Sequence, residues 1–118
     1  MEKSELKLLN SEHRLKTIEE LVIKTINEKY SDYNLCLDSL ASELNYHPAY
    51  LSSLFKNQVG VGISYFIRKI RFEKAYAMLL DGESVNQTAK KVGYDNAKSF
   101  SRAFKKQYGV IPSELFTK

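Results

Sequence analysis

The chain has 118 residues, 43% of them hydrophobic and 27% charged, a composition that argues against disorder and fits one domain or two very small ones. Its positive charge is concentrated in residues 60–118, which hold eleven basic and five acidic side chains and so suit an anionic partner such as nucleic acid or a membrane. Short apolar runs exclude a membrane-spanning helix, and the single cysteine, Cys36, excludes an internal disulfide and favours a reducing cytoplasm.

Helical periodicity, punctuated by a few glycines and prolines, predicts an all-α chain of about seven helices. Residues 1–10 are expected to form a tail or a linker remnant. Helices are expected over residues 11–30, 37–44, 48–58, 63–80, 84–93 and 96–108, with a short one after residue 112. The long fourth helix has these candidates for burial: Phe66, Ile67, Ile70, Ala75, Met78 and Leu79.

Residues that suit helix ends support these boundaries. Ser84 opens a capping box with Gln87, and Asp95 is the expected N-cap of the sixth helix. Cys36 is expected at the entry to the second helix. His47 is expected to cap or precede the third helix rather than to contact DNA.

The second half of the chain repeats the first. The segment from Ala41 to Tyr46 matches the segment from Ala89 to Tyr94 at an offset of 48 residues, and the following helices match at an offset of 49. A repeated pair of short helices joined by a tight turn is typical of the helix-turn-helix unit. We therefore expect one helix-turn-helix subdomain over residues 11–62, a linking helix over residues 63–81, and a second subdomain over residues 82–118.

Candidate binding residues lie on the outward sides of the third and sixth helices. A helical wheel groups Ala49, Ser52, Ser53 and Lys56 on one helix and Lys98, Ser101, Arg102 and Lys105 on the other. The second helix of such a unit enters the major groove of DNA. A polar side of a single helix usually contacts only solvent, but its repetition favours a DNA interface. The basic residues of the fourth helix could equally contact the DNA backbone or only solvent.

The sequence carries no sign of catalysis. His13 and His47 are far apart, and no Cys/His cluster has metal-ligand spacing. Five glycines provide neither a phosphate-binding loop nor a nucleophile elbow. We expect no enzyme activity, no metal and no cofactor.

Two stretches resemble the AraC/XylS-type helix-turn-helix DNA-binding domain, over roughly residues 12–116. The first is Ala41-x-x-Leu44-x-Tyr46-x-Pro48-x-Tyr50-Leu51-Ser52-x-Leu54-Phe55-Lys56. The second is Gly93-Tyr94-x(5)-Phe100-Ser101-Arg102-Ala103-Phe104-Lys105-Lys106-x-x-Gly109-x-x-Pro112-Ser113-Glu114. The segment from Arg68 to Leu79 also resembles the linking helix of that family. The order of its elements is also similar to that of the output domain of YesN-like response regulators.

The resemblance implies a bacterial, cytoplasmic transcription regulator with two recognition helices in successive major grooves. The base-contacting positions it implies are Ala49, Ser52, Ser53, Ala97, Lys98, Ser99 and Arg102. The backbone-contacting positions are Lys56, Arg68, Arg71, Ser101, Lys105 and Lys106. The implied partners are double-stranded DNA, RNA polymerase and an upstream effector or receiver domain of a full-length protein, with no membrane.

Three positions depart from the family pattern. Ser53 stands where arginine is frequent, Ser99 where an aromatic residue is common, and Asn45 where glycine is common. The first unit is therefore expected to contact fewer bases than the second.

The alternative is a helical protein–protein interaction module, a degenerate regulator that binds polymerase or another regulator. Apolar or acidic outward residues on the third and sixth helices would indicate it. The basic outward residues of the sixth helix favour DNA, while the acidic first half keeps the alternative open.

Overall fold

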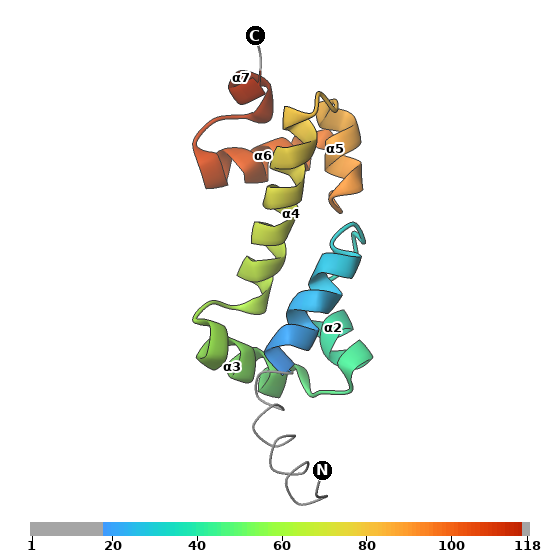
Figure 1. Cartoon of the computed structure of the whole chain (residues 1–118), viewed down its shortest axis with the longest axis vertical. Helices are drawn as coiled ribbons and strands as arrows, with labels where there is room; N and C mark the ends of the chain where they lie inside the picture. Colours follow the sequence, from blue (N-terminus) through green and yellow to red (C-terminus); the bar gives the residue numbers. More distant parts are fainter. Residues whose placement is uncertain (1–17, 117–118) are drawn as a thin grey trace, which may run out of the picture.

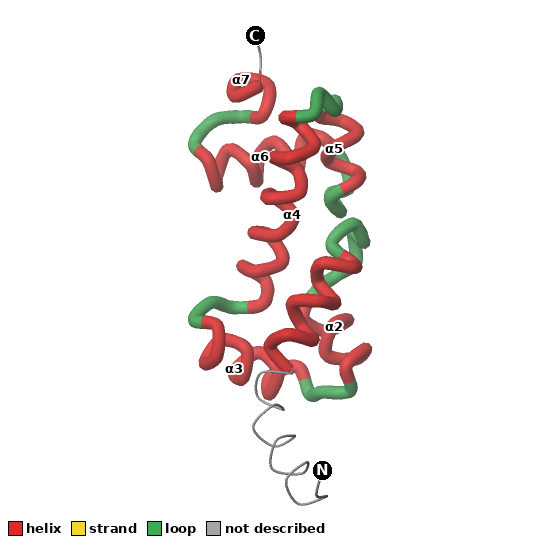
Figure 2. Tube along the Cα trace, in the orientation of Figure 1, coloured by secondary structure: helices red, strands yellow, loops and turns green. Residues whose placement is uncertain are grey.

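The computed structural model describes residues 18–116, and every regular element in that range is a helix (Figure 2). A helix over residues 18–29 is followed by α2 (Leu37–Leu44), α3 (Pro48–Val59), α4 (Ile63–Leu80), α5 (Val85–Lys91), α6 (Ala97–Tyr108) and α7 (Pro112–Phe116). The predicted all-α fold is thus confirmed. The expected tail over residues 1–10 and the start of the first predicted helix lie outside the described residues.

The hydrophobic core consists of two clusters that share α4. Figure 1 shows α4 running between the two groups of helices. The first lies among the N-terminal helix, α2, α3 and the first half of α4, to which α4 contributes Ile63, Ile67 and Ile70. The second lies among the rest of α4, α5 and α6, to which α4 contributes Phe72, Ala75 and Leu79. The linking helix therefore belongs to both units and holds a recognition helix at each end.

Two of the expected core residues of α4 are corrected by the structure. Phe66 and Met78 are only half-buried. Ile63 and Phe72, which the prediction omitted, are buried, with exposed fractions of 2% and 1%. The cause is that α4 buries one side against the first cluster and a different side against the second. A single apolar stripe does not describe such a helix.

The helix starts follow the predicted capping residues, with one correction. His47 Nδ1 accepts a hydrogen bond from the Ala49 N–H at 3.2 Å, and Ser84 Oγ accepts one from the Gln87 N–H at 3.1 Å. The cap of α6 is Asn96 rather than Asp95, because Asn96 Oδ1 accepts from the Ser99 N–H at 2.8 Å. The recognition helix therefore begins at Ala97 and not one residue earlier.

Candidate nucleic-acid interface

The two helix pairs, α2–α3 and α5–α6, have the same turn. The Tyr46 N–H donates to the Ala41 carbonyl at 2.9 Å, and the Tyr94 N–H donates to the Ala89 carbonyl at 2.9 Å. The residue before each tyrosine has a left-handed backbone, with φ of 62° at Asn45 and 88° at Gly93. Both pairs are helix-turn-helix units in which the second helix occupies the same place.

The second helices, α3 and α6, are fixed by fully buried side chains on their inner sides. Leu51 and Phe55 hold α3 in the first cluster, and Phe100 and Phe104 hold α6 in the second, all at 0% exposure. Because these side chains set the rotation of each helix about its axis, they also determine which residues reach solvent.

The outward side of α6 presents the predicted polar and basic residues. The exposed positions are Lys98, Ser99, Arg102, Lys105 and Lys106, and the half-buried positions are Ala97 and Ser101. The outward side of α3 is small and polar, with Ala49, Ser53 and Lys56 exposed and Ser52 half-buried. The sequence-predicted site residues on these helices therefore lie on two equivalent surfaces, of which the second is more basic.

An open cleft of about 410 Å³ lies between α4 and α6, next to the outward side of α6. Its lining residues are Arg68, Ala103, Lys106 and Gln107. Arg68 is exposed, and its guanidinium lies 5.9 Å from the centroid of the Tyr65 ring. The cleft brings together two of the predicted backbone-contacting residues, Arg68 and Lys106.

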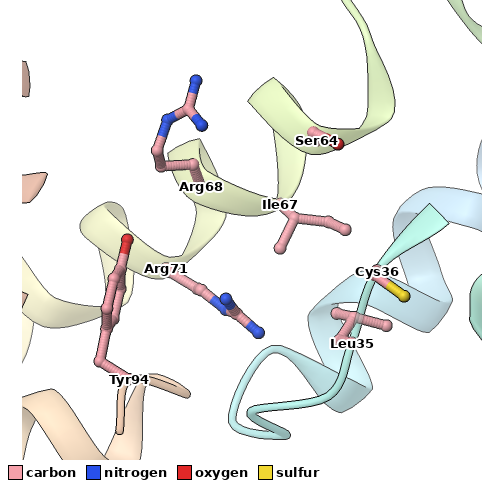
Figure 3. Close-up of a pocket in the computed structure, with 7 residues that line it drawn as sticks. All are labelled: Leu35, Cys36, Ser64, Ile67, Arg68, Arg71 and Tyr94. Carbon is pink, nitrogen blue, oxygen red and sulfur yellow. The ribbon is translucent and has the colours of Figure 1, made fainter. Parts of the chain in front are cut away.

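The structure places Arg71 outside this cleft. Its guanidinium points from α4 toward the loop that leads into α2 (Figure 3). There Nε donates to the Tyr30 carbonyl at 3.0 Å and Nη2 to the Asp32 carbonyl at 2.7 Å. Burial lowers the pKa of this guanidinium. Arg71 is therefore a half-buried side chain whose two main-chain partners make it a contact within the fold.

Tyr50, which the sequence prediction did not include among the site residues, is 56% exposed on α3 and stacks on Tyr46 with ring centroids 5.9 Å apart. Tyr50 stands 49 residues before Ser99 and so occupies the same place in the repeat. That equivalence to a predicted base-contacting residue is the signal that could have identified it.

The described residues hold no group of three or more His, Cys, Asp or Glu side chains placed to bind a metal ion. Nor does a helix among residues 18–116 have the length and apolarity needed to cross a membrane. Cys36 is exposed and caps α2, where hydrogen bonding to Ser39 lowers the pKa of its thiol.

Two equivalent, exposed second helices define a double helix-turn-helix protein, a class whose members bind DNA. Residues 40–118 match a family described as a helix-turn-helix domain. The chain is 35% identical, over 98 residues and 82% of its length, to the HTH-type transcriptional regulator YtdP of Bacillus subtilis (strain 168). It spans 13% of that relative and 27% of another, YesN of the same organism.

Solved structures of related domains have the same fold. The C-terminal domain of AraT, a response regulator from Geobacillus stearothermophilus, superposes with a TM-score of 0.81 at 38% identity, covering 86% of this chain and 84% of that one. The DNA-binding domain of AdpA, solved with a target DNA, has a TM-score of 0.74 over 83% of this chain and 88% of its own, at 17% identity, a likeness of fold alone. The chain belongs to the AraC/XylS-type helix-turn-helix family of transcription regulators.

Proposed function

We propose that this domain binds double-stranded DNA sequence-specifically, with α3 and α6 in two successive major grooves. The role of this binding is transcription regulation. One observation carries the proposal: two recognition helices with the same turn geometry present polar outward sides and are joined by one continuous helix. The 18-residue α4 is about 27 Å long. Major-groove segments on one side of B-DNA repeat at about 34 Å, so the two units together can span that distance.

The base contacts are expected to be stronger in the second unit. Arg102 can donate two hydrogen bonds to a guanine, and Lys98 and Ser99 lie beside it near the start of α6. In the first unit Ala49, Ser52 and Ser53 allow α3 to approach closely but offer no bidentate donor. Tyr50 joins them as a contact by its equivalence to Ser99.

The backbone contacts are expected at the ends and edges of these surfaces. Lys56 and Lys105 lie one turn beyond the base-contacting positions, where a helix in the groove meets the phosphates, and Ser101 lies on the same side of α6. Arg68 and Lys106 line the cleft between α4 and α6. We assign the cleft to the phosphates of the DNA segment that connects the two grooves.

The wider context of the domain is also a proposal. We propose the division into residues 11–62, 63–81 and 82–118 given by the repeat, and a non-catalytic role in the cytoplasm. An upstream effector or receiver domain and RNA polymerase are the proposed partners of a full-length protein. The larger size of the relatives and the description of AraT as a response regulator support a separate signal-receiving part.

Footprinting tests the two-groove arrangement. A site selected from random duplexes should be asymmetric, because the repeat is direct and its halves differ. One chain should protect two major-groove segments about ten base pairs apart from hydroxyl radicals, with a stoichiometry of one chain per site. Protection of one segment per chain, or an obligatory dimer on a palindrome, would contradict the proposal. No binding to any duplex at low salt would favour the protein–protein module instead.

Substitution Arg102→Ala tests the base-contact assignment. On the selected site it should weaken binding by about 1–3 kcal/mol and relax the preference at one base pair, because a bidentate guanine contact is lost. Lys90→Ala is the matched control, since it removes one exposed positive charge from α5 rather than from a recognition helix. An equal loss of affinity on every sequence, measured by fluorescence anisotropy, would make Arg102 a phosphate contact.

A further inference from the structure

The loop that follows the N-terminal helix makes contacts with both units. Tyr30, at its start, is half-buried and packs against both hydrophobic clusters. The Lys74 ammonium lies 5.7 Å from the centroid of the Tyr30 ring. The first unit is therefore attached to the second at this loop as well as through α4.

Arg71 holds this second attachment together. It projects from α4 close to where the two clusters meet, between Ile70 of the first and Phe72 of the second. Its two hydrogen bonds fix the carbonyls of Tyr30 and Asp32, and its guanidinium carbon lies 5.8 Å from the centroid of the Tyr94 ring. One side chain thus touches a loop of the first unit and the helix-turn-helix turn of the second (Figure 3).

The close approach at Gly93 shows how tightly the loop packs. A Cβ atom at Gly93 would lie 2.4 Å from the Tyr30 carbonyl oxygen and 2.9 Å from Arg71 Nε. The equivalent turn residue of the first unit is Asn45, which has a left-handed backbone and carries a side chain. The two turns share a backbone shape, so it is the packing of the loop that distinguishes the second.

We propose that Arg71 is a positioning residue that fixes the orientation of α3 relative to α6, and thereby the spacing of the two DNA half-sites that the domain accepts. This inference rests on the proposed function for its DNA part. A single helix joining two units can bend, and its bending changes the direction of both recognition helices. A second contact between the units near the middle of α4 opposes that bending. Arg71 makes this contact through its planar guanidinium, which donates two hydrogen bonds in a fixed geometry.

The structural part is tested without DNA. Nitroxide labels are placed at Asn57→Cys on α3 and Asn86→Cys on α5, both exposed positions, in a Cys36→Ser background. Pulsed dipolar spectroscopy should give a narrow distance distribution for the parent. Arg71→Ala should give one about twofold broader, because the unit-to-unit contact opens locally. Lys69→Ala removes an exposed charge from the same helix and should leave the width unchanged.

The functional part uses duplexes in which the selected half-sites are moved apart or together by one base pair. Each step shifts them by about 3.4 Å and rotates them by about 34°. The parent and Lys69→Ala should bind these duplexes about tenfold more weakly than the selected site. Arg71→Ala should bind the selected site more weakly, and its discrimination against altered spacing should fall below about threefold.

Two results would overturn the inference: an unchanged distance distribution in Arg71→Ala, or full retention of its spacing discrimination. Circular dichroism checks that the variant is folded. If Arg71→Ala is not, Arg71→Lys serves in both experiments, since lysine keeps the charge but cannot reproduce the two-donor geometry. If neither the parent nor any variant binds DNA, the proposed function is refuted. The distance distributions then decide by themselves whether Arg71 fixes the orientation of the two units.

Discussion

Substitution Phe72→Ala is expected to lower the free energy of unfolding by about 3–5 kcal/mol, the cost of removing a fully buried aromatic ring. The Phe72 ring lies at the centre of the second cluster. Its centroid is 6.1 Å from that of Phe104, 6.2 Å from that of Tyr94 and 5.9 Å from that of Tyr108. Removing the ring leaves a cavity under α6, so specific DNA binding should fall together with stability.

Urea unfolding followed by circular dichroism measures this loss. Tyr65→Ala is the matched control, because it removes an aromatic ring from an exposed position on the same helix. A surface change of that kind should stay within about 0.5 kcal/mol of the parent. A loss below about 1 kcal/mol for Phe72→Ala would mean that the second cluster does not depend on this ring.

The repeat explains why the fold and both recognition helices were predictable. The turn hydrogen bonds, the left-handed turn residues and the capping residues all act within a few residues of chain, so the local sequence determines them. Asn96 shows the limit of that reasoning. Asp95 and Asn96 are both good N-caps, and the choice depends on which side chain reaches the Ser99 N–H when α6 packs into the second cluster through its own Phe100 and Phe104.

Arg71 and Phe72 could not be predicted in the same way. The carbonyl partners of Arg71 lie 41 and 39 residues earlier in the chain, so no local sequence pattern can predict these hydrogen bonds. From the sequence, Arg71 was only a basic residue on a linking helix near a basic surface, and its contact with the loop depends on how the loop packs on α4. Phe72 follows it on the side of α4 that only the second cluster uses. Both positions depend on the docking of two units, which is a tertiary property.

Substitution Gly93→Ala is expected to be more destabilising than the same change at Gly109, although both glycines have the same backbone shape. Their φ angles are 88° and 85°, so an alanine would carry the same left-handed strain of about 1–2 kcal/mol at either position. At Gly109 the new methyl group meets no atom within 4 Å. At Gly93 it would lie 2.4 Å from the Tyr30 carbonyl oxygen, which adds about 1–3 kcal/mol of overpacking.

The difference between the two variants isolates the loop contact from the backbone strain. Relief of the clash requires the Tyr30 carbonyl to move, and that movement breaks its hydrogen bond to Arg71. Gly93→Ala and Arg71→Ala should therefore be strongly non-additive in a double-mutant cycle. Both substitutions remove the hydrogen bond between Arg71 and the Tyr30 carbonyl, so its loss counts only once in the double variant. Unfolding free energies of the four proteins measure the coupling. Additive losses would mean that the Gly93 turn and the Arg71 hydrogen bonds are independent, and that the loop is held at two separate points.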